Sequence, residues 1–163
     1  MSGVRMYKVP NRIARLALGN GGVTVRQAVQ QANAALDELR PPCLEIIDEV
    51  MAEIERRFGA GAAGRKAEPL GDLYALGLKI IEVAIGLPNS GIDEGARALC
   101  DMVDRSLAKD VVAWEAIDVH LQTLMLLRAR GQAFTPEQRN AVLIGLKKVT
   151  TKKVGAADEP EAT

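Results

Sequence analysis

The sequence predicts an all-α protein, a compact bundle of about five main helices preceded by a short basic N-terminal helix or turn. Aromatic residues make up only 3% of the 163 residues, whereas Ala, Leu, Val and Ile are plentiful. That mixture suits closely packed helices better than strands, which favour β-branched and aromatic residues. A chain of 163 residues is long enough to bury one hydrophobic core. We therefore expect a basic arm at 1–23, a helical bundle domain at 24–153 and a disordered acidic tail at 154–163.

The first main helix is expected from Thr24 to about Arg40. Thr24 can cap its start, and Gln27 stands three residues later, where its side chain can cap in return. The apolar residues of this segment recur at intervals of three and four, which predicts one buried face. They are Val25, Ala28, Ala32, Leu36 and Leu39.

Two prolines separate the first helix from the second. Pro41 is expected to end the first helix, and Pro42 can open the next, because a missing N–H has no partner in a first helical turn. The second helix is expected to bury Leu44, Ile47, Met51, Ile54 and Phe58.

The second half of the chain predicts four further helices. Residues 59–69 are rich in glycine and alanine without apolar periodicity, and we interpret them as a flexible connection. The last helix has the best start: Thr135 as cap, Pro136 in the first turn and Gln138 at the reciprocal capping position. The four helices are expected near residues 70–87, 92–107, 110–129 and 135–153.

The charge is balanced overall but unevenly distributed. The formal net charge is zero, yet residues 1–36 contain five basic residues and no acid. Such a segment can contact a phosphate-rich or acidic partner, although a solvated arm explains it more simply. Nucleic-acid binding is not expected, because base-reading aromatics and an overall basic charge are lacking. With only two cysteines and no signal or membrane-spanning segment, we expect a cytoplasmic protein without membrane insertion.

The only histidine, His120, lies on the expected helix 110–129. The pattern places it at the edge of a stripe formed by Trp114, Ile117, Leu121 and Leu124. A boundary imidazole can be structural or can accept a phosphoryl group in a histidine phosphotransfer domain. Those domains commonly carry a lysine and a small residue three and four positions after the histidine, where this chain has Thr123 and Leu124. We therefore prefer the structural interpretation.

Other catalytic or metal chemistry has little support. Cys43, Cys100 and His120 come from three separate expected helices, whereas a zinc site needs three or four well-placed ligands. Phosphate-binding loops, the serine-hydrolase turn and dinucleotide fingerprints are absent from the sequence. We therefore expect no enzyme activity, metal or cofactor.

A second phosphoryl-handling pattern lies at the start of the last helix. Glu137 and Asn140 match the E-x-x-N spacing of helical phosphatases that act on response regulators, in which the acid anchors the partner and the amide positions water. A carboxylate in a first helical turn is also favoured by the helix dipole alone. We prefer that simpler explanation.

The helix that carries His120 is apolar on two sides. Opposite the first stripe, Val112, Val119 and Leu126 recur at seven-residue spacing. A helix of this kind is usually central in its own bundle or covered by another chain. We expect a central position, with a homodimer or a partner-docking surface as the alternative.

A resemblance extends over most of residues 21–149. The segments "GGVTVRQAVQQANAALDELRPPCLEIIDEVMAEIE", "LYALGLKIIEVAIGLPNSGIDEGARALCDMVDR", "WEAIDVHLQTLMLLR" and "QRNAVLIGLKKV" resemble the CheE family, small accessory proteins encoded in alphaproteobacterial chemotaxis operons. The resemblance implies a cellular context and no site residues. We therefore interpret the chain as a non-enzymatic helical interaction or regulatory protein of a chemotaxis or two-component pathway, with a signalling protein as its partner. The alternative is phosphoryl handling through His120 or through Glu137 and Asn140.

Overall fold

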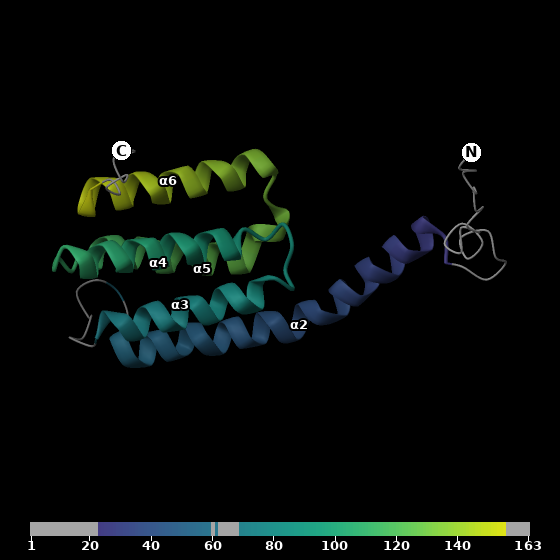
Figure 1. Cartoon of the computed structure of the whole chain (residues 1–163), viewed down its shortest axis with the longest axis horizontal. Helices are drawn as coiled ribbons and strands as arrows, with labels where there is room; N and C mark the ends of the chain where they lie inside the picture. Colours follow the sequence, from purple (N-terminus) through teal and green to yellow (C-terminus); the bar gives the residue numbers. More distant parts are fainter. Residues whose placement is uncertain (1–22, 60, 62–68, 156–163) are drawn as a thin grey trace, which may run out of the picture. The chain divides into compact units, whose positions relative to one another are not determined.

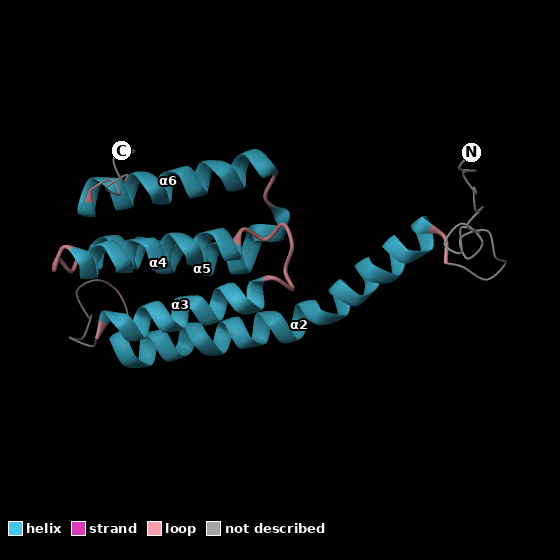
Figure 2. Ribbon diagram, viewed as in Figure 1, coloured by secondary structure: helices cyan, strands magenta, loops and turns pink. Residues whose placement is uncertain are grey.

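The predicted all-α bundle is confirmed. The computed structural model describes residues 23–59, 61 and 69–155, and all regular structure within them is helical (Figures 1 and 2). A short 3-10 helix, η2 (Gly131–Ala133), follows α5. The α-helices of the described residues are α2 (Val25–Phe58), α3 (Leu70–Ala84), α4 (Ile92–Ala108), α5 (Trp114–Arg130) and α6 (Pro136–Val154).

Helix α4 lies at the centre of the bundle, in contact with α3, α5 and α6 (Figure 1). It buries an unusually broad surface that includes Ala96, Leu99 and Met102, all with no measurable exposure. The second half of α2 adds Ile54 and Phe58 to the same core. The core residues of α3, α4 and α5 sit at the three-and-four spacing from which these helices were predicted.

Helix α2 does not end at the two prolines, so the predicted break is wrong. Pro41 and Pro42 both lie inside the helix. Proline removes one backbone donor, but its ring holds φ near the helical value, so the chain can stay helical with the loss of two backbone hydrogen bonds. The expected buried face of the first half is also wrong: Leu36 is half-buried, and the others are exposed. Those exposed residues are Val25, Ala28, Ala32 and Leu39.

The first turns of α2 belong to a different unit from the rest of the bundle. The chain divides into two compact units, residues 1–35 and residues 36–163, whereas the expected bundle domain begins at residue 24. Residues 1–22 of the predicted arm lie outside the described part of the chain. The capping box at Thr24 is confirmed: the Gln27 N–H donates to Thr24 Oγ1 at 3.2 Å, and the Thr24 N–H donates to Gln27 Oε1 at 3.0 Å.

The bundle also extends two residues beyond its predicted end at 153. Val154 is only 5% exposed and belongs to the core, and the Gly155 carbonyl accepts a hydrogen bond from Arg105 Nη1 at 2.9 Å. The first residue of the expected tail therefore completes the buried side of α6. Residues 156–163 lie outside the described residues.

Two truncations should separate the bundle from its tail. Deleting residues 154–163 is expected to lower the free energy of unfolding by about 2 kcal/mol, because a buried valine and a tertiary hydrogen bond are lost. Deleting only residues 156–163 should leave it unchanged, since "AADEPEAT" has no apolar periodicity. Urea denaturation of both variants is the measurement, and equal effects would contradict the assigned boundary.

Candidate functional site

His120 lies in the core of the bundle. Of the predicted core stripe of α5, Ile117, Leu121 and Leu124 are 0–4% exposed, and Trp114 is half-buried against the same core. His120 is 0% exposed as well, so its expected position at the boundary is wrong. The reason is α6, which covers this side of α5 and brings Thr150 Oγ1 to 3.1 Å from the imidazole Nε2.

Both imidazole nitrogens of His120 have partners. Nδ1 lies 2.8 Å from the Ala116 carbonyl oxygen, which can only accept a hydrogen bond. In the neutral ring Nδ1 therefore carries the proton, and Nε2 accepts from the Thr150 hydroxyl. That hydroxyl also lies 3.2 Å from the Leu146 carbonyl oxygen. Because the hydroxyl has a single hydrogen to donate, Nε2 and the carbonyl oxygen compete for it. His120 thus ties α5 to α6, and neither nitrogen is open to an incoming phosphoryl group.

The pKa of His120 is lowered from its ordinary value of 6.5. Burial is the main cause because it disfavours the charged ring; the hydrogen bond to Ala116 and the charge of Asp101 act in the opposite direction. The neutral ring is therefore the form that holds the two helices together at neutral pH.

This lowered pKa predicts a pH-dependent stability. The unfolded chain takes up the histidine proton at a higher pH than the folded chain does, so acid favours unfolding. The contribution should be complete above about pH 6.5 and should be lost as the pH falls through the folded-state pKa. Urea denaturation from about pH 7.5 to about pH 5 covers both sides of the ordinary histidine pKa. Over this range the free energy of unfolding should fall more steeply for the natural protein than for His120→Gln. Parallel profiles would contradict the argument.

Glu137 and Asn140 lie in the first turns of α6, and both are exposed. The predicted capping box is present: the Gln138 N–H donates to Thr135 Oγ1 at 3.2 Å, and the Thr135 N–H donates to Gln138 Oε1 at 3.0 Å. The pKa of Glu137 is lowered by a hydrogen bond from its own backbone N–H and by one from the Thr135 side chain. The Glu137 carboxylate therefore already satisfies donors at the helix start, as the simpler explanation requires.

The second apolar side of α5 is only partly covered by the rest of the described chain. Val119 is 40% exposed and Leu126 is 42% exposed, so the expected central position is wrong on this side. The packing of α4 and α6 covers only the side that includes Ile117 and His120. Val112, 49% exposed, precedes α5, because the helix begins at Trp114 rather than near residue 110. We call Val119 and Leu126, with Val112 before them, the α5 outer face.

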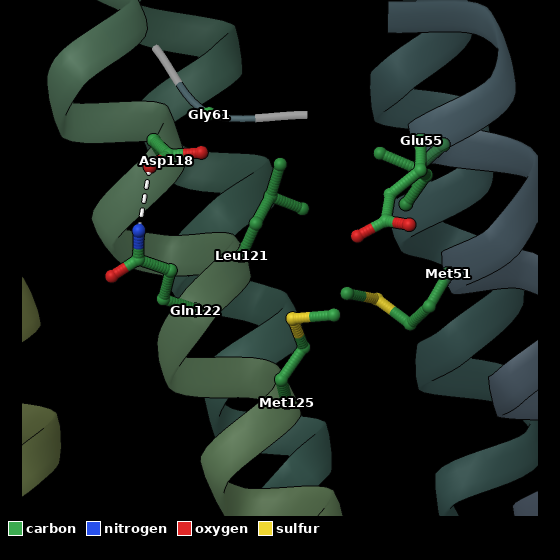
Figure 3. A pocket seen from close by; sticks show the side chains of 8 residues that line it. Met51, Glu55, Gly61, Asp118, Leu121, Gln122 and Met125 are labelled. Carbon is green, nitrogen blue, oxygen red and sulfur yellow. Dashed lines mark hydrogen bonds between the residues drawn. The ribbon is translucent and has the colours of Figure 1, made fainter. Parts of the chain in front are cut away.

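A groove that the sequence did not predict lies between α2 and α5 (Figure 3). One hollow of about 210 Å³ and a second of about 290 Å³ share Met51, Glu55 and Met125, so the two hollows adjoin, and we call them together the α2/α5 groove. Neither helix alone indicates it, because the groove depends on the separation of two helices that are far apart in sequence. The remaining lining residues are Asp48, Ala52, Ile54, Gly61, Asp118, Leu121, Gln122 and Arg128.

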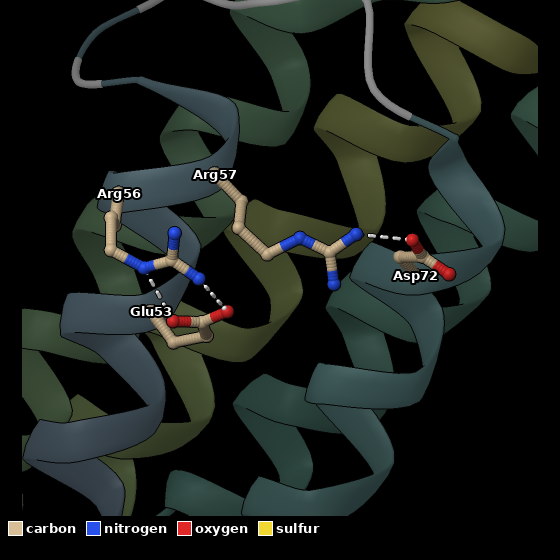
Figure 4. A network of polar contacts seen from close by, with 4 residues as sticks. All are labelled: Glu53, Arg56, Arg57 and Asp72. Carbon is tan, nitrogen blue, oxygen red and sulfur yellow. Dashed lines mark hydrogen bonds and ion pairs between the residues drawn. The ribbon is translucent and has the colours of Figure 1, made fainter.

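A polar network joins α2 to α3 near the end of α2 (Figure 4). Arg56 forms an ion pair with Glu53 on the same helix, and Arg57 forms one with Asp72 of α3. The Arg56 guanidinium lowers the pKa of Glu53. Arg57 also lies over the Phe58 ring, 5.7 Å from its centroid. These contacts position α2 on the bundle and bring together no nucleophile and base.

The described ranges offer neither a metal cluster nor a membrane-spanning helix. They contain no group of three His, Cys, Asp or Glu side chains that could hold a metal ion. Cys43 and Cys100 are free thiols, and burial raises the pKa of the Cys100 thiol. None of the described helices is both long and apolar enough to cross a membrane.

Comparisons of the chain with protein-family models, with curated proteins and with solved structures give no match. The resemblance to the CheE family therefore rests on the sequence segments alone.

Proposed function

We propose that this chain is a non-enzymatic helical interaction protein that acts in the cytoplasm, in a bacterial chemotaxis or two-component pathway. The observation that carries the proposal is the α5 outer face, where Val119 and Leu126 remain about two-fifths exposed. The pathway is inferred from the resemblance to the CheE family. A partner signalling protein, or a second copy of the chain, would cover this face.

Covering the α5 outer face would contribute a modest free energy of binding. A fully buried Val or Leu side chain contributes roughly 1.5–3 kcal/mol, so covering the exposed part of each residue would contribute roughly 1 kcal/mol. Because the two side chains lie two helical turns apart on one face, a single helix or strand of a partner could cover both.

A double variant tests this proposal. Val119→Glu with Leu126→Glu should remain folded, because both side chains are partly in water, and it should lose the cellular partner or the dimer because two charges would be buried unpaired. Pull-down from cells that express the tagged protein, light scattering for the oligomeric state, and circular dichroism are the measurements.

The matched control places the same charges elsewhere. Leu78 and Ile85 are 42% and 77% exposed at α3 and its C-terminal cap, so Leu78→Glu with Ile85→Glu should keep the partner. Loss of the partner in both double variants would count against the α5 outer face. Unfolding of the α5 variant would show that this face belongs to the core.

The phosphoryl-handling alternative is tested separately. Incubation with a phosphorylated response regulator should leave the regulator's phosphorylation lifetime unchanged, for the natural protein as well as for His120→Gln and for Glu137→Gln with Asn140→Ala. Acid-labile, base-stable label on the protein that disappears in His120→Gln would overturn the non-enzymatic proposal.

A further inference from the structure

We propose that the α2/α5 groove is a second docking site, which binds a basic amphipathic helix of a partner protein. This inference rests on the proposed function and deepens it by naming the chemistry of a partner. The groove lining includes none of the residues of the α5 outer face, so the two surfaces can be tested with different variants.

The groove has the shape of a helix-binding site. Asp48 of α2 forms an ion pair with Arg128 of α5, while Glu55 lines the same hollow as Asp118, so the two helices run antiparallel. At a rise of 1.5 Å per residue, the lining from residue 118 to residue 128 extends about 15 Å. That length matches roughly three turns of a bound helix. Figure 3 shows Met51 and Met125 reaching toward each other from the two walls.

The floor of the groove is apolar and adaptable. Ile54 and Leu121 are buried at 0% and 4% exposure, and Met51 is 8% exposed. Met125, at 45% exposure, leaves much of an unbranched thioether side chain accessible at the groove wall. Methionine-lined grooves suit amphipathic helices, because the flexible side chains adjust to residues spaced three and four apart.

The lining of the groove carries three carboxylates, those of Asp48, Glu55 and Asp118, and one guanidinium, that of Arg128. At one end Asp48 is neutralised by Arg128, and the pKa of Arg128 is raised by this carboxylate. At the other end Glu55 is exposed and lies across from Asp118, which accepts a hydrogen bond from Gln122 Nε2 at 2.7 Å. The exposed Glu55 carboxylate thus stands beside an apolar floor. Charge complementarity therefore selects lysine or arginine in the bound helix, beside its apolar face.

The probe is a synthetic peptide of about 14 residues, which covers the roughly three turns of the groove with about one turn to spare, with leucines spaced three and four apart and lysines on either side. Its affinity for the full chain is measured by fluorescence anisotropy at about 0.15 M salt, which screens long-range attraction. A peptide of the same pattern with glutamate in place of lysine should bind at least ~10-fold more weakly, because its carboxylates would meet the exposed carboxylate of Glu55.

Variants of the protein locate the binding. Glu55→Lys and Met125→Asp should each weaken binding at least ~10-fold, the first by repulsion and the second by burying a charge. Glu49→Lys is the matched control, because Glu49 is exposed on α2 and does not line the groove. It should change the affinity less than ~2-fold, as expected for a peripheral charge. Circular dichroism should confirm that all variants are folded.

Three results would overturn the proposal. Equal weakening by Glu49→Lys and Glu55→Lys would indicate diffuse attraction to acidic residues. Equal affinity for the lysine and glutamate peptides would show that the groove does not select a basic partner. A dimer of the natural chain that Met125→Asp converts to monomers, without peptide binding, would identify a second copy as the occupant. Val119→Glu with Leu126→Glu should still bind the peptide, so failure of the proposed function and failure of the groove are distinguishable.

Discussion

Replacing Gly131 with alanine should lower the free energy of unfolding by about 3 kcal/mol, because the added methyl group has no room. A Cβ at this position would lie 2.1 Å from the carbonyl oxygen of Ser90 and 3.1 Å from its carbonyl carbon. These are backbone atoms, which cannot rotate away as the end of a long side chain can. Relief requires η2 to separate from the turn before α4, where the Ile92 N–H donates to Ser90 Oγ at 3.2 Å.

Gly145 is the matched control for this substitution. It lies in α6, and a Cβ there would meet nothing within 4 Å. Gly145→Ala should therefore raise the free energy of unfolding by roughly 0.5–1 kcal/mol, because alanine loses less backbone entropy in a helix. Urea denaturation measures both variants. If Gly131→Ala proved as stable as Gly145→Ala, the close approach of η2 to Ser90 would be wrong.

Replacing His120 with alanine should lower the free energy of unfolding by about 2–4 kcal/mol, a sum of cavity formation and a lost hydrogen bond. The imidazole fills space between α5 and α6 and reaches Thr150 Oγ1, so its removal leaves a void at a fully buried position. Val119→Ala, at an exposed position of the same helix, should change the free energy by no more than about 0.5 kcal/mol. Urea denaturation at neutral pH is the measurement.

His120→Leu separates the two causes of that loss. Leucine refills most of the void, and the Thr150 hydroxyl can still donate to the Leu146 carbonyl oxygen 3.2 Å away. No buried donor is then left without an acceptor, so His120→Leu should recover most of the stability lost in His120→Ala. If leucine were as destabilising as alanine, the contact with Thr150 would contribute more than the filling of space.

Local patterns predicted the start of α6 and the face of α5 that enters the core. The start of α6 at Pro136 follows from the box of Thr135 and Gln138, which needs only four consecutive residues. The core stripe through Ile117, Leu121 and Leu124 follows from helical periodicity. The same local reasoning failed at Pro41 and Pro42, because a proline lowers the stability of a helix without forbidding its continuation.

The candidate sites were harder to predict, because each depends on a second helix. Whether His120 is a boundary or a buried residue is decided by α6, which brings Thr150, 30 residues further along the chain, to the ring. Val119 and Leu126 fit a central or an outer side of α5 equally well, since periodicity describes the faces of a helix but not what covers them. The groove at Met51 and Met125 exists only because α2 and α5 lie apart.

The amino-acid sequence by itself determined the helical class, the capping boxes at Thr24 and Thr135 and the core stripe of α5, because these depend on residues within a few turns of one another. Only the tertiary structure decided which remaining faces stay in water. That choice depends on how α2, α4 and α6 are arranged around α5, a competition between distant apolar surfaces for burial that no local pattern encodes. It buried His120, left the α5 outer face exposed and opened the α2/α5 groove.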